Sequence, residues 1–144
     1  MPEKKTIARA KRDKAQGKST STQAGEFVHE EMDHIRKGKH GARSSKQAIA
    51  IGLSKARRSG VDLPAPKKGA TPAATRKKAQ RDLEKGRSGK KTQPSAKRSQ
   101  ARRKALKKEP RSAASKSALS KQAKRAASKR RARGKVTPAK RRGR

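Results

Sequence analysis

The chain has 144 residues, of which 46 are lysine or arginine and only 10 are aspartate or glutamate, for a formal net charge of +36. It contains no cysteine, which excludes disulfide bonds, thiol catalysis and cysteine-bound zinc. Large apolar side chains are scarce, and Phe27 is the single aromatic residue. Since a chain that buries little apolar area does not offset the entropy cost of folding, we expect a mostly α-helical protein with extensive disorder.

The charge is unevenly distributed along the chain. Residues 24–63 hold eight basic and five acidic residues, net +3, whereas the rest holds 38 basic and five acidic residues, net +33. We therefore divide the chain into a basic N-terminal arm (1–23), a helical-hairpin module (24–66) and a basic low-complexity tail (67–144). No apolar run has the length of a membrane span or of a signal-peptide core, so we expect an intracellular protein.

The first helix of the hairpin is predicted at about 24–38. Phe27, Val28, Met32 and Ile35 form one apolar stripe at helical spacing. Acidic residues lie early in this segment and basic residues lie late, which suits the helix dipole.

The second helix of the hairpin is predicted at about 45–59. Ser44 and Gln47 match a capping box, and Gly60 provides a glycine end. Ile51 lies away from the expected packing face, which makes it a possible contact for a partner or for a second copy of the chain. The predicted hairpin core comprises Phe27, Val28, Met32, Ile35, Ile49, Leu53 and Val61, with Leu63 at its margin.

The tail contains three alanine-rich segments with helix punctuation, at about 72–85, 95–108 and 112–133. Their apolar stripes consist of alanine and single leucine residues. We expect conditional helices that fray in water and become firm when phosphates neutralise their repulsion.

The stretch HEEMDH, at 29–34, suggests a zinc-protease motif but has the wrong spacing. That motif needs histidines at i and i+4, whereas Asp33 occupies the second position and His34 comes one residue later. A third ligand is missing unless His40 swings in, and a solvated acidic face is the favoured reading. No nucleophile–base pair or nucleotide-binding fingerprint is present either. We expect no enzyme, and we assign no catalytic, cofactor-binding or metal-binding residue.

The basic segments predict binding to the phosphate backbone of nucleic acid. Each cation set against a phosphate releases counterions, so affinity rises without any reading of bases. Aromatic residues that would stack on single-stranded bases are absent, which favours the backbone of duplex DNA, or of structured RNA, over single strands. The candidate contacts are Arg76, Lys77, Lys78, Arg102, Arg103, Lys104, Lys107, Lys108, Lys124, Arg125, Lys129, Arg130, Arg131, Arg133, Lys140, Arg141, Arg142 and Arg144.

Residues 25–69, and above all KHGARSSKQAIAIGLSKARRSGV at 39–61, resemble a small uncharacterised bacterial family. Some members of that family carry the label plasmid stabilization protein. The stretch SAASKSALSKQAKRAA at 112–127 resembles the same family, and the remaining tail is similar in composition to bacterial linker-histone-like proteins. The resemblance implies a bacterial origin and a small helical domain with a Lys/Ala-rich tail, and it brings no catalytic residues.

We therefore expect a non-enzymatic, histone-like protein of the bacterial nucleoid that binds duplex DNA without sequence preference. It would need no cofactor, membrane or small-molecule substrate, and the hairpin would allow self-association. One alternative is an interaction or regulatory module, for instance in plasmid maintenance or stress response, whose tail only localises it. Another is an RNA-associated or ribosome-associated protein.

Overall fold

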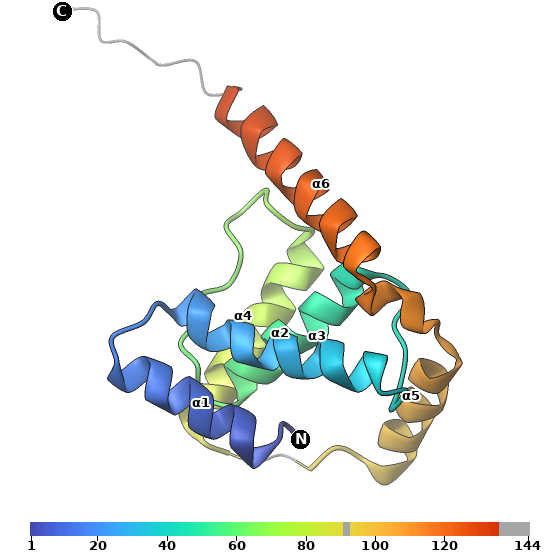
Figure 1. The fold of residues 1–144 in the computed structure, drawn as a ribbon. Helices are drawn as coiled ribbons and strands as arrows, with labels where there is room; N and C mark the ends of the chain where they lie inside the picture. Colours follow the sequence, from blue (N-terminus) through green and yellow to red (C-terminus); the bar gives the residue numbers. More distant parts are fainter. Residues whose placement is uncertain (91–92, 136–144) are drawn as a thin grey trace, which may run out of the picture.

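The computed structural model describes residues 1–90 and 93–135, and its regular structure in these ranges is helical (Figure 1). None of the helices in these ranges is long and apolar enough to cross a lipid bilayer. In chain order the elements are α1 (Lys4–Ala15), α2 (Thr20–Arg36), α3 (Ser45–Arg58), α4 (Ala73–Ser88), α5 (Ala96–Lys108), the short 3-10 helix η1 (Arg111–Ala114) and α6 (Lys116–Lys135).

Helices α2 and α3 form the predicted hairpin, and polar caps fix where each helix begins. The Ser19 hydroxyl accepts a hydrogen bond from the backbone N–H of Thr22 at 3.2 Å, so α2 begins earlier than its apolar stripe indicates. The Ser44 hydroxyl accepts a bond from the backbone N–H of Gln47 at 3.2 Å, which confirms the predicted cap of α3. The side chain of Gln47 reaches back and accepts a bond from the N–H of Arg43 at 2.7 Å.

The apolar core consists of two clusters along the hairpin, and alanine supplies much of both. Phe27 and Ile35 are its largest fully buried apolar side chains. The first cluster comprises Ala10, Ala24, Phe27, Ala56, Val61 and Leu63, with Ile7 and Leu53 packed against it. The second comprises Met32, Ile35, Ala42, Ala48, Ala113 and Ala114, with Val28, Ile49 and Leu119 packed against it.

The first residues of the chain form a packed helix. Helix α1 lies along α2 and places Ala10 in the first cluster (Figure 1). An ion pair between Arg9 Nε and Glu26 Oε2, at 2.8 Å, joins the two helices. The backbone N–H of Glu3 donates to Glu30 Oε2 at 3.1 Å, which anchors the start of the chain on α2.

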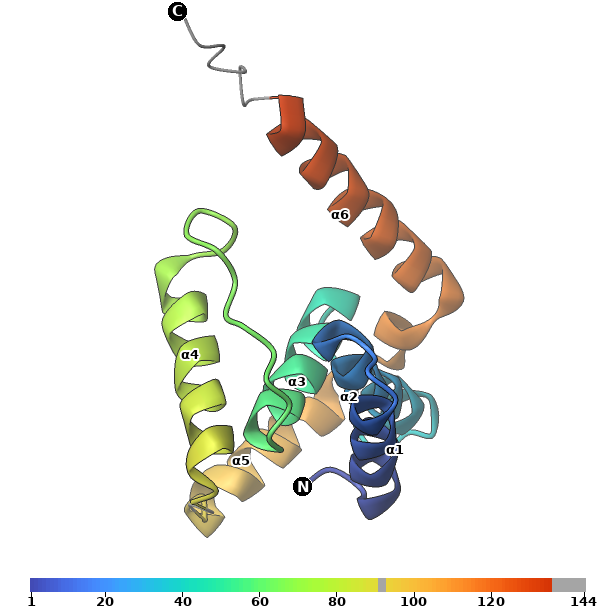
Figure 2. The same ribbon diagram turned by 90° about the vertical axis from the view of Figure 1, so that its left-hand side faces the viewer.

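Helix α4 packs on α3 through a polar contact and a close backbone approach (Figure 2). The Ser54 hydroxyl donates to Asp82 Oδ2 at 2.6 Å. A Cβ atom at Gly86 would overlap with the carbonyl oxygen of Arg57, so glycine is required where the end of α4 meets the end of α3. The Arg57 side chain turns inward and donates to the carbonyl oxygens of Leu63 and Pro64 at 3.1 and 3.2 Å. Burial lowers the pKa of Arg57, and the charge of Asp82 opposes that effect.

Helix α5 buries no residue and is held at its C-terminal end. There the backbone N–H of Gly41 donates to the carbonyl oxygen of Leu106 at 2.8 Å. The adjoining η1 inserts Ala113 and Ala114 into the second cluster. The first turns of α6 lie against η1 and α3, and the rest of α6 projects away from the other helices (Figures 1 and 2).

The chain therefore has an all-α fold of six packed helices, and the prediction of extensive disorder is wrong for the residues that the structure describes. The prediction of a disordered, low-complexity tail fails with it, because α4, η1 and α6 dock on the hairpin. Composition misled because it counts large apolar side chains. Here alanine and glycine faces bring helices close together, and close packing gains dispersion energy from small side chains as well.

Candidate functional site

Two features of the structure carry candidate chemistry: a cationic surface on α4–α6, and a buried cluster of carboxylates, histidines and a lysine beneath α1. The first was anticipated from the sequence. The second contains the motif HEEMDH and His40, the residue that the sequence offers as a conditional third ligand, and the structure brings them together.

The predicted nucleic-acid contacts lie on α4, α5 and α6, and almost all of those described are exposed. Arg76 is half-buried at the start of α4. Arg133 donates to the carbonyl oxygens of Gly69 and Ala70 at 2.9 and 3.1 Å, so its guanidinium links α6 to the loop before α4. Four further predicted contacts, Lys140, Arg141, Arg142 and Arg144, lie outside the described residues.

The cationic surface is not neutralised from within the protein. Residues 73–135 contain 25 basic and three acidic residues, net +22. Helices α5 and α6 together contain sixteen basic residues and no acidic one. Among the described side chains, no cation of α5 or α6 lies in an ion pair with a carboxylate, whereas α4 contributes Arg87 to a pair with Asp62 at 2.6 Å.

An open hollow of about 340 Å³ with a mixed polar and apolar lining lies where the N-terminal ends of α3 and α6 meet. Its lining includes the basic side chains of Arg43, Lys121 and Arg125, together with the N-cap residues Ser44 and Ser115. Backbone N–H groups at helix starts and nearby cations both favour an anion. The hollow is therefore suited to a phosphate group.

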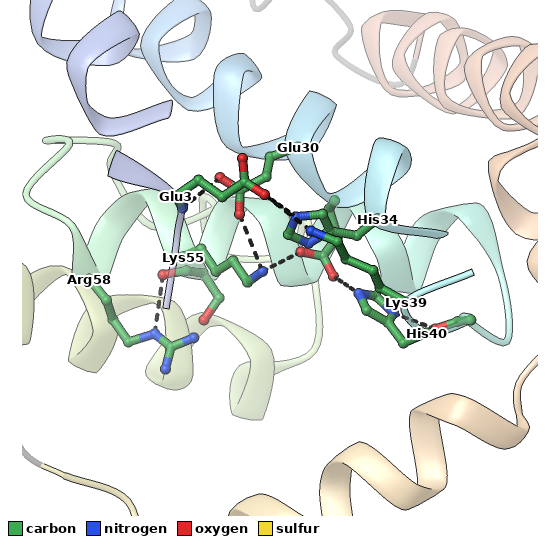
Figure 3. Close-up of polar contacts among 10 residues, drawn as sticks. Glu3, Glu30, His34, Lys39, His40, Lys55 and Arg58 are labelled. Carbon is green, nitrogen blue, oxygen red and sulfur yellow. Dashed lines mark hydrogen bonds and ion pairs between the residues drawn. The ribbon is translucent and has the colours of Figure 1, made fainter. Parts of the chain in front are cut away.

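The buried cluster lies where Glu30 of α2 approaches Lys55 of α3 (Figure 3). Glu31 is at its centre. Its carboxylate lies 2.7 Å from His40 Nε2 through one oxygen and 2.6 Å from Lys55 Nζ through the other. Neighbouring Glu30 lies 3.7 Å from the same lysine nitrogen. Both carboxylates are almost fully buried, and Glu31 is 1% exposed.

The N-terminal segment covers this cluster. Glu3 Oε1 lies 3.0 Å from His34 Nε2 and 3.2 Å from Lys39 Nζ. Hydrogen bonds from His34 and then from Lys39 lower the pKa of Glu3 from 4.5 to about 2, because they stabilise its ionised form. Glu3 therefore stays charged and contacts the side chains of His34, at the end of α2, and Lys39, in the turn after it.

The turn after α2 brings His40 back over the helix. Gly38, with φ of 75°, adopts the left-handed conformation that glycine favours. The N–H of Gly38 bonds to the carbonyl oxygen of Ile35 and that of Lys39 to the carbonyl oxygen of His34, which is the Schellman pattern. A straight helix would not place His40 beside Glu31. Gly38 is the residue in the sequence that indicates the helix end and the chain reversal that bring them together.

The side chains predicted as the hairpin core lie in or against the two apolar clusters. Phe27, Met32, Ile35 and Val61 are buried. Val28, Ile49 and Leu53 are half-buried and pack against the clusters. Ile51, the candidate partner contact, is half-buried and lies one turn before Ser54, on the side of α3 that faces α4.

These features define an all-α protein with a charge-balanced helical hairpin and a cationic outer surface. Residues 4–68, which span α1, α2, α3 and the loop that follows, match a family of unknown function (DUF6496). No curated protein and no solved structure matches the chain.

Proposed function

We propose that the protein is a non-enzymatic, histone-like DNA-binding protein whose helices α4–α6 bind the phosphate backbone of duplex DNA. The observation that carries this proposal is the separation of charges. Eight of the ten acidic residues lie in ion pairs, and all but one of these, Asp82, lie within residues 1–63, in α1–α3 or in the segments that flank and connect them. The cations of α5 and α6 are left for an external polyanion.

The shape of α6 supports backbone binding. Its 20 residues span about 30 Å at 1.5 Å per residue, which is close to one turn of duplex DNA. The helix projects from the body with exposed cations along it, so phosphates can approach it from several sides (Figure 2). The hollow lined by Arg43, Lys121 and Arg125, at the N-terminal end of α6, is large enough to bind one phosphate.

Recognition of single-stranded bases has little support. The single aromatic residue, Phe27, is 1% exposed and belongs to the core, so no aromatic ring is available for stacking on a base. Recognition through phosphates alone predicts similar affinities for unrelated duplex sequences and a strong dependence on salt.

The proposal is tested with two variants of equal charge. The α6 variant carries Lys124→Gln, Arg125→Gln, Lys129→Gln and Arg130→Gln, and the control carries Lys4→Gln, Lys5→Gln, Lys11→Gln and Lys14→Gln. All eight side chains are exposed, and none is in an ion pair with an acidic residue. Affinity for a random-sequence duplex is measured across a salt series. Each lost phosphate contact lowers the slope of log K against log salt by about 0.9, so four lost contacts lower it by about 3.6.

We expect the salt slope of the α6 variant to fall by most of this amount, about 3.6, relative to the wild type, and the slope of the control to fall much less. Equal losses in the two variants would show that net charge acts without a defined surface and would contradict the assignment to α4–α6. Preference for structured RNA over duplex DNA at the same salt would replace the DNA proposal with RNA or ribosome association.

An interaction module is the second candidate, and a different observation favours it. An apolar hollow of about 420 Å³ lies along α2 and α3, and Val28, Met32, Ile49, Leu53 and Leu119 contribute to its lining. The label plasmid stabilization protein, carried by members of the family that the sequence resembles, fits a regulatory partner as well as a nucleoid protein. Loss of a cellular phenotype on Ile49→Asp, with unchanged DNA affinity, would favour the interaction module.

A further inference from the structure

We propose that Glu31, His34 and His40 form a binding site for a divalent transition-metal ion of the zinc type. One ligand atom from each of the three residues lies within 4.8 Å of the other two. Imidazole nitrogen and carboxylate oxygen are ligands that zinc accepts in proteins. The site lies beneath α1 and does not depend on the proposed binding of DNA.

The hydrogen bonds of His40 prepare it as a ligand. Its Nδ1 lies 2.9 Å from the carbonyl oxygen of Gly41, and because a carbonyl only accepts, Nδ1 carries the proton. In a neutral ring Nε2 then presents a lone pair, 2.7 Å from Glu31 Oε1. The lone pair of Nε2 and the carboxylate oxygen repel each other at 2.7 Å. The contact is favourable only if a metal ion binds both atoms or if the ring carries a second proton. Histidine ligands of metals commonly donate their other N–H to a backbone carbonyl.

The carboxylates at the site are incompletely satisfied. Glu30 Oε1 is buried, accepts no hydrogen bond and lies 3.7 Å from Lys55 Nζ, whereas Glu31 Oε2 lies 2.6 Å from the same nitrogen. The two buried carboxylates, Glu30 and Glu31, share the single ammonium group of Lys55, which leaves one negative charge when both histidines are neutral (two minus one). An uncompensated buried charge is costly, and a bound dication removes that cost.

The backbone places the three ligands without rearrangement of the fold. Glu31 and His34 are three residues apart on α2 and share a face, and the left-handed turn at Gly38 returns His40 to that face. Zinc bonds of about 2.0 Å require ligand atoms about 3.3 Å apart. Side-chain rotations would therefore separate His40 Nε2 from Glu31 Oε1, now 2.7 Å apart, and bring the third ligand atom, now within 4.8 Å, closer to them. Glu3 Oε1, 3.0 Å from His34 Nε2, orients that ring.

The site is enclosed, as expected for a structural metal. His34 and His40 side chains are 13% and 16% exposed. The segment after His40 carries the contacts to α5 and η1, because Gly41 bonds to Leu106 and Ala42 bonds to the carbonyl oxygen of Pro110 at 3.1 Å. A bound ion would fix this segment and, through it, the base of the cationic surface.

The rival explanation is a doubly protonated His40 that forms only an ion pair with Glu31. The experiment uses the full chain, freed of nucleic acid and treated with a chelator, and titrates it with Zn²⁺ by calorimetry. The variants are His34→Gln and His40→Gln. The matched control is His29→Gln, since His29 lies on the same helix, is 62% exposed and contacts only Asp33, at 3.4 Å.

We expect one Zn²⁺ per chain in the wild type and in the His29→Gln protein. Loss of His34 or His40 should weaken Zn²⁺ binding by at least about 10-fold. Substituting a residue that only supports a ligand already weakens metal binding by about 10–100-fold, so removing a ligand should cost at least as much. The helical content of each variant is checked by circular dichroism. Absence of Zn²⁺ binding by the wild type, or an equal loss in the His29→Gln control, would overturn the proposal.

A second measurement covers the case in which a variant unfolds. Wild-type protein is titrated with Co²⁺, and the visible spectrum is recorded. An intense absorption band, typical of four or five ligands, is the expected result. The weak spectrum of six-coordinate aqueous Co²⁺ throughout the titration would show that no enclosed site exists, whatever the variants do.

Discussion

The contact between α2 and α3 depends on a glycine, and replacing it by alanine is a sharp test of the fold. A Cβ atom at Gly52 would lie 2.7 Å from Val28 Cα, 2.9 Å from Val28 Cγ2 and 3.0 Å from Val28 N. Two of these three atoms belong to the backbone of α2, so a side-chain rotation cannot remove the overlap. Ordinary contact begins near 3.4 Å, so the helices must separate by about 0.7 Å.

The magnitude follows from two opposing effects. Alanine is favoured over glycine inside a helix by about 1 kcal/mol. Overpacking a tight contact costs about 1–3 kcal/mol, and the upper part of that range applies where backbone must move. We therefore expect Gly52→Ala to lower the free energy of unfolding by about 1–2 kcal/mol. Gly25 is the matched control, because it lies in α2 with no atom within 4 Å of an added Cβ, and Gly25→Ala should gain about 1 kcal/mol.

Urea unfolding of both full-length variants, followed by circular dichroism, measures the difference. The two proteins should differ by about 2–3 kcal/mol, or by several degrees in melting temperature. A Gly52→Ala protein as stable as the Gly25→Ala protein would refute the close approach of α2 and α3, and with it the packing of the hairpin.

Three further stability predictions concern polar contacts between elements. Asp82→Ala removes the acceptor that ties α4 to α3 and should cost about 1.5–3 kcal/mol in urea unfolding, whereas Glu84→Ala, on the exposed side of α4, should change stability by less than about 0.5 kcal/mol. Arg57→Met leaves two carbonyl oxygens without donors and should cost about 2 kcal/mol by the same assay. Ser45→Ala removes the buried hydroxyl that donates to η1 and should lower the melting temperature by a few degrees, while Ser117→Ala, exposed at the start of α6, should not.

The positions of α2 to α6 could be predicted from local signals, whereas their packing could not, and α1 was missed because residues 1–23 show only a basic arm. The cap at Ser44, the glycine at Gly60 and the prolines of the tail act within a few residues, so the sequence displays them directly. The docking of α4 depends on Ser54 of α3 and on Asp82 and Gly86 of α4. Ser54 lies about 30 residues before the other two in the chain. Nothing in either segment alone indicates that a small polar contact and a missing Cβ meet there.

The two candidate sites differ in the same way. The cationic surface follows from composition, because an excess of cations must lie on the outside wherever the helices pack. The buried cluster needs a chain reversal at Gly38, a lysine from α3 and a glutamate from the start of the chain. The spacing rule for two histidines on one helix disfavours the motif. The sequence names His40 as a further ligand only on the condition that the following segment turns back, and the rule itself does not show that it does.

The placement of the acidic residues connects the fold to the proposed function. Ten acids spread evenly through the chain would pair with cations everywhere and leave no surface strongly charged. Instead, most of them hold α1–α3 together, where burial strengthens the pairs of Glu30 and Glu31, and α5 and α6 contain none. Residues that stabilise the hairpin are therefore different from those that would meet a polyanion. Substitutions on α6 can change binding while the hairpin stays intact, and this separation is what makes the proposed surface testable.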